Sequence, residues 1–575
     1  MKQAVALLEP ASVWRLRLAA VLLSVAELAM MGRLFDLHVF DRDFYQRHGD
    51  ARAIRTETIE AHRGMIIDRN GHPLAVSTPL ESICANPKSV LAAAERIPEL
   101  ARALEIDPKE LIAKLQAGAA ARREFLYLRR QLPPDLASAI LDLKVPGIYG
   151  RTEYRRYYPD GEVTAHVLGF TNVDDHGQEG VELAFDGHLR GQDGRRKVLQ
   201  DRRAEPIREL SRIRDPRPGG ELRLSLDARI QALAYRELKA AVQENGAAGG
   251  SVVMLDSTTG DVLAMVNQPS FNPNNRIGLQ PHNLRNRAII DLVEPGSTVK
   301  PFTLAVALAS GRYQPSTVID TTPGYIQING KVIRDVHNYG VIDLSHVLSK
   351  SSNVGTIKVA LTLEETAVRD LFDQVGLGRS TGSGFPGEAV GSLPSGSMRH
   401  PLVRATLSFG YGLAVTPLQL AEAYSVLAND GVRRGIKILA DSAVDPGVRV
   451  IDSQVNRQIV AMLEQVVTPG GTGFKARVPG YRVAGKTGTV HKIGTGGYEA
   501  SNYLSVFAGF APVEQPRVVA VIIIDNPTAG AYYGGAVAAP VFGKVMTGTL
   551  RLLDVPPDGL PEGGKGLQVA KGGTP

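Results

Sequence analysis

One apolar segment near the N-terminus limits what this 575-residue chain can be. The segment runs from Leu18 to Gly32 and holds no charged residue except Glu27. Its fifteen residues would span about 22 Å as a helix, short of a hydrocarbon core of about 30 Å, so neighbours on both sides must join the crossing. We expect a membrane anchor over residues 15–40, with Arg15, Arg17 and Arg33 reaching the interfaces.

The charges around this segment predict its orientation. Basic residues precede it and acidic residues follow it: Lys2, Arg15 and Arg17, then Asp36, Asp41 and Asp43. The positive-inside rule then predicts a cytoplasmic tail over residues 1–14, with everything after the anchor exported. A cleaved signal peptide is the alternative, because Ser24-Val25-Ala26 offers small residues at a cleavage position. Glu27 either contacts a partner helix or is a protonated or interface-seeking side chain.

The composition is that of a globular protein. Hydrophobic residues make up 43% and charged residues 22%, which excludes disorder, collagen and a many-helix transporter. Lys plus Arg exceeds Asp plus Glu by 65 to 59, an excess too small to indicate nucleic acid. Cys84 is the single cysteine, and the 12 histidines form no HExxH-like pair, so we expect no disulfide, no metal site and no cofactor.

The chain after the anchor divides at Asp215 to Gly220, a segment rich in Pro and Gly. Before it, residues 41–215 show no single strong period and predict an irregular α+β module. Arg63 to Gly71 predicts a short strand entering an Asn-Gly turn. Ala92 to Gln116 is helical in pattern, interrupted at Pro98 and Pro108.

The second domain, residues 221–555, begins with a helix that Asp227 caps and Asn245-Gly246 ends. Two hairpins lie near its ends, and some 230 mostly helical and loop residues separate them. The predicted strands are Ser251 to Leu255 with Asp261 to Val266, and Leu504 to Ala511 with Arg517 to Asp525. The expected fold is α+β: an antiparallel sheet built from both ends of the domain and covered by helices. From Pro556 onward a disordered tail is expected.

Three short motifs stand in order in the second domain: Ser297-Thr298-Val299-Lys300, Ser351-Ser352-Asn353 and Lys486-Thr487-Gly488. Ser351 follows Ser297 by 54 residues, and Lys486 follows Asn353 by 133. Each motif alone is weak. Together, in this order, they are highly specific for serine acyltransferases that react with penicillin.

Ser297 and Lys300 form the candidate nucleophile pair. Glu294-Pro295-Gly296 predicts a turn, and Lys300 to Ala309 a helix closed by Gly311. Ser297 then lies at a helix N-terminus, which favours a developing anion, with the Lys300 amine one turn away. Lys300 acts as a base only when neutral, so burial and a second cation, which Lys486 can supply, must lower its pKa. An ordinary helix start with a solvated lysine is the alternative.

Ser351 and Asn353 are two residues apart and point to the same side of a loop. Asn353 can hold a substrate amide and the Lys300 amine, and Ser351 can pass a proton to the leaving amine. The alternative is a helix-capping cluster before Val354.

Lys486-Thr487-Gly488-Thr489 predicts an edge strand able to pair with an extended peptide. Glycine there lets a substrate backbone approach closely. The amides of Thr489 and Ser297 would form an oxyanion hole, and the Thr487 and Thr489 hydroxyls could hold a terminal carboxylate. A surface strand with a polar face is the alternative.

With these motifs the chain resembles the class B penicillin-binding proteins, and among them the septal peptidoglycan D,D-transpeptidases of Gram-negative cell division. The likeness runs from about Trp14 to Asp558. In the N-terminal half, Arg63-Gly64, Asp68 to Gly71 and Gly180-Val181-Glu182 resemble the non-catalytic pedestal, or dimerisation-like domain, of the class. The likeness is densest in Asn286 to Thr303, Ala405 to Gly412, Thr416 to Leu420 and Tyr532 to Gly535.

The resemblance implies an enzyme anchored in the bacterial inner membrane with a periplasmic catalytic domain. It would acylate Ser297 with D-Ala-D-Ala and pass the acyl group to an amine of a neighbouring stem peptide, and β-lactams would block it. Tyr503, Tyr532 and Tyr533 match aromatic positions near the substrate groove, with simple sheet packing as the alternative. A lipid-II polymerase and other membrane proteins of the division complex are the implied partners.

The sequence departs from the pattern of these enzymes at Val299, Met398-Arg399-His400 and Glu27. These departures leave open whether the protein is the main division enzyme or a divergent paralogue. The alternatives are an elongation-type or stress-specific transpeptidase, or a penicillin-binding scaffold or sensor with little turnover. No long glycosyltransferase-like segment precedes the catalytic domain, which disfavours the bifunctional class A type. No deacylating base stands out, which disfavours a β-lactamase.

Overall fold

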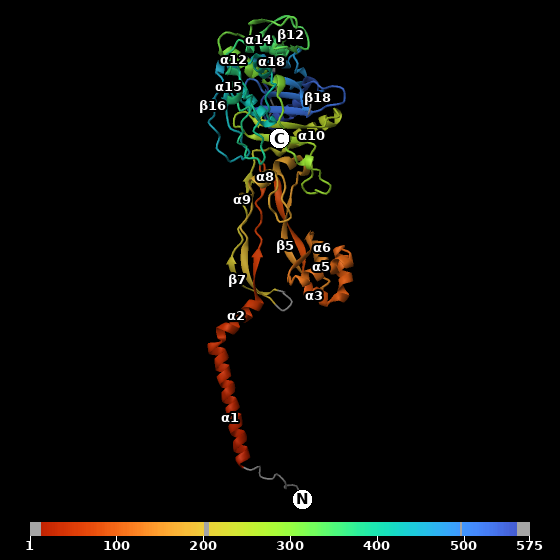
Figure 1. The fold of residues 1–575 in the computed structure, drawn as a ribbon, viewed down its shortest axis with the longest axis vertical. Helices are drawn as coiled ribbons and strands as arrows, with labels where there is room; N and C mark the ends of the chain where they lie inside the picture. Colours follow the sequence, from red (N-terminus) through yellow and green to blue (C-terminus); the bar gives the residue numbers. More distant parts are fainter. Residues whose placement is uncertain (1–12, 201–205, 495–496, 560–575) are drawn as a thin grey trace, which may run out of the picture. The chain divides into compact units, whose positions relative to one another are not determined.

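The computed structural model describes residues 13–200, 206–494 and 497–559 (Figure 1). These residues form two compact units. The first contains residues up to Ala61, Pro79–Tyr154 and Gln192–Arg217, and the second contains His62–Thr78, Arg155–Gly191 and the chain from Pro218. Strands β3 (Pro73–Ala85) and β5 (Ile148–Tyr157) belong partly to each unit. The domain limits expected from the sequence remain a prediction.

The first unit begins with the expected anchor. Helix α1 (Val13–Phe35) continues through a π-helical stretch, Asp36–Phe40, into α2 (Arg42–Ala53), in the red part of the chain (Figure 1). Among the described residues, Trp14–Phe40 is the one helix long and apolar enough to cross a membrane, judged by length and composition. Because α1 starts at Val13, the flanking residues lengthen the short apolar run as expected.

Beyond α2 the first unit holds a small sheet and a helical lobe. Strands β1 (Ile54–Ile59), β6 (Gly194–Gln200) and β7 (Pro206–Arg214) pair in that order, all antiparallel. The lobe packs Leu100, Leu111 and Ile140 into one apolar core. Its elements are α3 (Pro87–Ala92), α4 (Ile97–Leu104), α5 (Pro108–Ala120), β4 (Leu126–Leu132) and α6 (Pro134–Leu141).

The prolines of this lobe begin helices and do not interrupt one. Pro98 lies in the first turn of α4 and Pro108 is the first residue of α5, capped by Asp107. A proline in the first turn costs little because the N–H that it lacks has no partner within the helix there. The expected helical pattern over Ala92 to Gln116 is therefore present, divided near Pro98 and Pro108 into separate helices.

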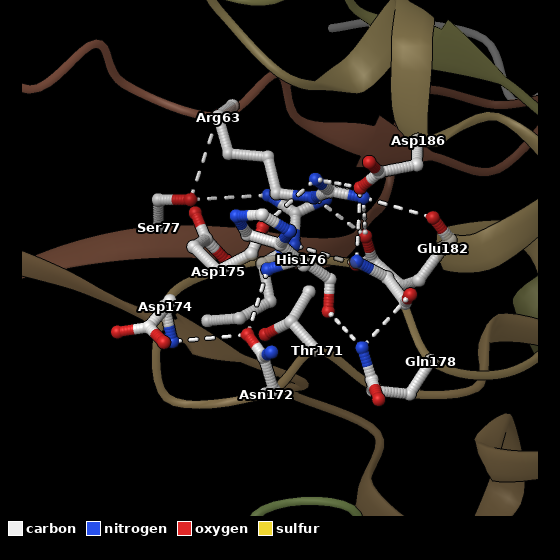
Figure 2. A network of polar contacts seen from close by, with 12 residues as sticks. Arg63, Ser77, Thr171, Asn172, Asp174, Asp175, His176, Gln178, Glu182 and Asp186 are labelled. Carbon is white, nitrogen blue, oxygen red and sulfur yellow. Dashed lines mark hydrogen bonds and ion pairs between the residues drawn. The ribbon is translucent and has the colours of Figure 1, made fainter.

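In the second unit, two of the pedestal-like motifs, Arg63-Gly64 and Gly180-Val181-Glu182, meet in a buried ion-pair network (Figure 2). Arg63 Nε donates to Glu182 Oε2 at 2.7 Å, and its Nη1 donates to Asp186 Oδ1 at 2.7 Å. Arg156 Nε donates to the other oxygen of Glu182 at 2.6 Å. Arg63 is 1% exposed and Glu182 0%, so each buried charge has a partner, as burial requires. The remaining elements here are β2 (Ile66–Ile67), η3 (Gly161–Val163), α7 (Ala165–Leu168), α8 (Gly180–Ala184), α9 (Asp186–Leu189) and β8 (Leu222–Arg223).

The main sheet of the second unit is antiparallel, in the order β10-β9-β19-β18-β17. Both predicted hairpins are present, and β17 forms one edge. β19 is buried as far as Ile524, so helices cover both faces. The strands are β9 (Gly249–Asp256), β10 (Val262–Gln268), β17 (Ala484–Gly494), β18 (Gly497–Ala511) and β19 (Val518–Asp525).

Two groups of helices cover this sheet. Helices α10 (Ala228–Glu244) and α19 (Gly534–Leu552) contact each other and the sheet, and so do α17 (Pro417–Ala428) and α18 (Ser453–Val467). Asp227 caps α10 by accepting from the Arg229 amide at 3.0 Å, and Asn245 ends it, as predicted.

The segment between the hairpins is largely helix and loop, as expected. Its helices are α11 (Arg287–Ile290), α12 (Lys300–Ala309), α13 (Leu344–Ser349), α14 (Asn353–Ala360), α15 (Ala367–Gln374) and α16 (Pro401–Ser408). Its strand pairs are β11 (Val318–Asp320) with β14 (Val341–Asp343), β12 (Tyr325–Ile328) with β13 (Lys331–Arg334), and β15 (Val432–Arg433) with β16 (Val448–Arg449).

The ordered chain continues past Pro556, where the sequence led us to expect disorder. Asp558 accepts hydrogen bonds from the amides of Arg482 at 2.8 Å and Val513 at 2.9 Å. The rest of the expected tail, residues 560–575, lies outside the described residues.

Candidate active site

Ser297 stands in a short 3₁₀ turn, Gly296–Val299, that leads directly into α12. Gly296 has φ +54°, a left-handed conformation that glycine adopts without strain, and its amide donates to Gly410 O at 3.1 Å. The Tyr424 hydroxyl donates to Thr298 O at 2.8 Å from the buried side. Ser297 is half-buried between buried neighbours, so the turn presents its side chain from a fixed backbone.

The Lys300 amine is buried and contacts the second motif. Its Nζ donates to Ser351 O at 2.6 Å and to Asn353 Oδ1 at 2.8 Å, and it lies 3.3 Å from Ser351 Oγ. The side chain is 0% exposed. The second motif therefore positions the amine, as expected for Asn353. Among the hydrogen bonds of the described residues there is none between Lys300 and Ser297, so the expected contact between them is not made in this state.

Burial lowers the pKa of Lys300 to about 7, while the negative charge of Asp335 acts in the opposite direction. Burial also holds the pKa of Lys486 well below its ordinary value, and repulsion from Lys300 lowers it further. The expected effect of burial on Lys300 is thus present. Because repulsion between two like charges is mutual, it disfavours having both amines protonated at once.

Asp335, which the sequence motifs do not include, holds the second motif in place. Ser352 Oγ donates to Asp335 Oδ2 at 2.6 Å, and the Val354 amide donates to Oδ1 at 3.0 Å. Ser352 in turn caps α14 by accepting from the Gly355 amide at 2.9 Å. Helix capping, the alternative reading of this cluster, therefore belongs to Ser352. Ser351, at φ +62°, and Asn353 remain free to contact Lys300.

The third motif lies on edge strand β17, as predicted. Lys486 is 0% exposed, and its Nζ donates to Thr487 O at 3.1 Å. Thr487 Oγ1 donates to Thr472 Oγ1 at 2.9 Å, and Thr489 Oγ1 accepts from the Gly534 amide at 3.0 Å.

Gly488 faces the serine turn and not the cavity. A Cβ added there would lie 3.0 Å from Thr298 Cγ2 and 3.1 Å from Pro295 O. The absence of a side chain therefore lets β17 pack against the turn that carries Ser297. This differs from the reason expected from the sequence, which was close approach of a substrate.

A cavity of about 680 Å³ opens over these motifs. Its wall includes Ser297, Ser351, Asn353, Thr487 and Thr489, whereas Lys300, Lys486 and Gly488 are outside that wall. At one side stand the three predicted tyrosines. Tyr503 stacks on Tyr532 with ring centroids 4.2 Å apart, and Tyr532 stacks on Tyr533 at 4.5 Å.

Several residues of the wall escaped the sequence motifs. His491 lies two residues beyond Thr489 on β17, with its ring 4.5 Å from that of Tyr503. Lys350 immediately precedes the second motif, and this position could have indicated that it lies near the site. Thr472 and Lys475 come from the segment after α18, and no local pattern marks them.

The comparisons with known proteins agree with this geometry. Residues 250–547 match the penicillin binding protein transpeptidase domain, and residues 58–224 match the penicillin-binding protein dimerisation domain. The peptidoglycan D,D-transpeptidase FtsI of Escherichia coli is 46% identical over 557 residues, covering 96% of this chain and 94% of that protein. The probable peptidoglycan D,D-transpeptidase PbpC of Pseudomonas aeruginosa is 42% identical, covering 95% and 96%.

Solved structures of penicillin-binding proteins also resemble this chain. Penicillin binding protein 3 of Mycobacterium tuberculosis in complex with aztreonam has a TM-score of 0.67 at 29% identity, covering 87% of this chain and 98% of that one. The transpeptidase domain of Burkholderia pseudomallei penicillin-binding protein 3 has a TM-score of 0.54 at 39% identity, covering 59% and 98%.

The chain therefore belongs to the penicillin-binding proteins, as a class B member with dimerisation and transpeptidase domains. Within that class it is a peptidoglycan D,D-transpeptidase of the septal type, which cross-links peptidoglycan in cell division and is a target of β-lactams.

Proposed function

We propose that Ser297 is the nucleophile of this transpeptidase and that Lys300 is its general base. The observation that carries the proposal is the buried Lys300 amine, which Ser351 and Asn353 hold by hydrogen bonds. With its pKa lowered to about 7, a large fraction of this amine is neutral at neutral pH and can take the Ser297 proton.

In the acylation step, Ser297 Oγ attacks the carbonyl carbon of the penultimate D-Ala. The oxyanion forms between the amides of Ser297 and Thr489, on the serine turn and on β17. The bond to the terminal D-Ala nitrogen then breaks, and the proton taken from Ser297 passes to that nitrogen through Lys300 and the Ser351 hydroxyl, which lie 3.3 Å apart. Lys486 supports this proton relay from its buried place beside Lys300.

The terminal carboxylate of the donor lies at Thr487 and Thr489. Each hydroxyl carries one proton. That of Thr487 is donated to Thr472 Oγ1 in this structure and must turn from Thr472 to reach the carboxylate. Thr489 Oγ1 accepts from the Gly534 amide, which leaves its O–H for the carboxylate. Gly488 shapes the strand, and Tyr503, Tyr532 and Tyr533 line the side of the cavity that receives the acyl part of the donor.

In the second step, an amine of a neighbouring stem peptide attacks the ester carbon. The new C–N bond forms, the C–O bond to Ser297 breaks, and the amine gives up a proton while Ser297 Oγ regains one. The enzyme returns to its starting state with one cross-link formed.

We further propose that α1 anchors the protein in the inner membrane with the N-terminus cytoplasmic and the catalytic domain periplasmic. Lys2, Arg15 and Arg17 lie on the N-terminal side of the apolar run, and Asp36, Asp41 and Asp43 follow it, which supports this orientation. The septal role requires partners in the membrane, and a lipid-II polymerase that makes the strands to be cross-linked is the first candidate. Midcell localisation of a tagged copy, and filaments on depletion, are expected. Rounded cells on depletion would contradict the septal role.

The proposed roles are tested by turnover. The full-length protein in detergent should join a thioester stem-peptide mimic to free D-Ala, and Lys300→Ala should lose this activity although Ser297 is intact. A variant that keeps it would refute Lys300 as the base. Penicillin labelling by wild-type protein without any turnover would favour the scaffold or sensor reading.

A further inference from the structure

The active-site cavity has two lysines in its wall, Lys350 and Lys475, that the proposed acylation step does not use. With Gly470–Thr472 they form its basic end, and all of these residues line the same 680 Å³ cavity as Ser297. Thr472 connects it to the third motif, because its hydroxyl accepts from that of Thr487 at 2.9 Å. The other end, beyond Thr489 on β17, holds His491 and the stacked tyrosines.

The charges at the basic end are not neutralised by the protein. Of the described residues that line the cavity, none is Asp or Glu. An ammonium has three N–H donors, and that of Lys350 has a single hydrogen bond in the described part of the chain, to Gly470 O at 2.9 Å. Lys475 is exposed and has no ion pair within the same described ranges. Two like charges facing one cavity favour an anionic ligand.

This anion is not the terminal carboxylate of the donor, which Thr487 and Thr489 already receive in the proposed mechanism. The donor ends at that carboxylate, so no part of it extends further, past Thr487 toward Thr472 and Lys475. The acceptor is longer on this side and can extend there, because the cavity wall continues to Thr472 and Lys475. Its amine attacks the carbon from which the donor's terminal amine departed, and the two amines therefore occupy the same place in turn. Groups of the acceptor beyond its amine then reach the basic end.

We propose that Lys350 and Lys475 form an acceptor subsite that binds a second carboxylate of the incoming stem peptide, in addition to the carboxylate beside its amine. This inference rests on the proposed function of Ser297 and names the class of acceptor that the same cavity takes: an amino acid or peptide with two carboxylates. An amine that lacks the second carboxylate leaves the two lysines without a counter-charge and competes less well with water for the acyl-enzyme.

Paired acceptors test the subsite. D-Glutamate and D-glutamine have nearly the same shape but differ by one carboxylate, and D-2-aminoadipate and its side-chain amide form a longer pair. The full-length protein in detergent is acylated with a thioester stem-peptide mimic, and the acceptor concentration that gives half-maximal aminolysis is measured for all four. For at least one pair, wild-type protein should need about tenfold less of the diacid than of the amide, the loss expected for one charge-assisted hydrogen bond.

Lys475→Gln should abolish this preference by weakening only the diacid. Lys331→Gln removes an exposed lysine on β13 outside the cavity wall and should keep the preference. Equal use of acid and amide by wild-type protein in both pairs, or an unchanged preference in Lys475→Gln, overturns the subsite. Failure of the proposed function itself looks different, because no acyl-enzyme would then form from the thioester, which intact-mass measurement detects before any acceptor is added.

Discussion

Acylation should fall steeply as the pH drops below 7, because Lys300 must be neutral to take the Ser297 proton. The pKa of Lys300 is lowered to about 7 by burial. With that value about half of the amine is neutral at pH 7, about a tenth at pH 6 and about a hundredth at pH 5. An ordinary solvated lysine, with a pKa near 10.4, would be neutral in only about one molecule in 2,500 at pH 7. Burial thus raises the reactive fraction by about a thousandfold.

The assay is the second-order rate constant for labelling by a fluorescent penicillin, measured from pH 5 to pH 9 on full-length protein. We expect a plateau above pH 8 and a tenfold fall per pH unit below 6. The carboxylate of Asp335 raises the pKa of Lys300, so Asp335→Asn should move the midpoint to lower pH. Thermal denaturation at each pH serves as the control for unfolding. A rate that is constant from pH 5 to pH 8, or one that still rises about tenfold per pH unit at pH 9, would refute Lys300 as a base with a pKa of about 7.

Three further predictions concern the buried ion-pair network, the serine turn and the N-terminal segment. Glu182→Gln leaves Arg63 and Arg156, both buried, without a full counter-charge, and should lower the free energy of unfolding by about 3–5 kcal/mol in a denaturant titration. A loss of less than about 1 kcal/mol would show that the network is not stabilising. Gly296→Ala puts a Cβ 2.5 Å from Val490 Cγ2 at φ +54°, and the labelling rate should fall at least tenfold, whereas an unchanged rate would mean that the turn tolerates displacement. N-terminal sequencing of membrane-extracted protein should find residues before Leu18 still present, while a first residue at Glu27 would indicate a cleaved signal peptide.

The catalytic motifs could be read from the sequence because each is local. The Ser297 turn, α12 and the edge position of β17 follow from a Pro-Gly turn, an apolar period and a strand pattern within a few residues. That the three motifs lie close together was inferred from their occurrence in this order, which is specific for one class of enzyme. The hydrogen bonds of Lys300 to Ser351 and Asn353 agree with this inference for the first two motifs.

What the sequence did not reveal depends on contacts between distant segments. Asp335 reaches the start of α14 only because the fold brings the end of β13 there. Lys475 lies in the cavity wall because the chain after α18 passes beside the cavity. The sequence marked Gly488, but glycine is needed there because the serine turn packs against it. A strand pattern gives no information on that contact between distant segments.

The identity of the nucleophile is the central claim, and covalent labelling tests it most directly. Full-length protein treated with a fluorescent penicillin should gain one label per chain, and peptide mapping should place the label on Ser297. Ser297→Ala should not be labelled, whereas Ser395→Ala, which changes an exposed serine outside the cavity wall, should be labelled like the wild type. Equal labelling of Ser297→Ala and wild-type protein would contradict the account.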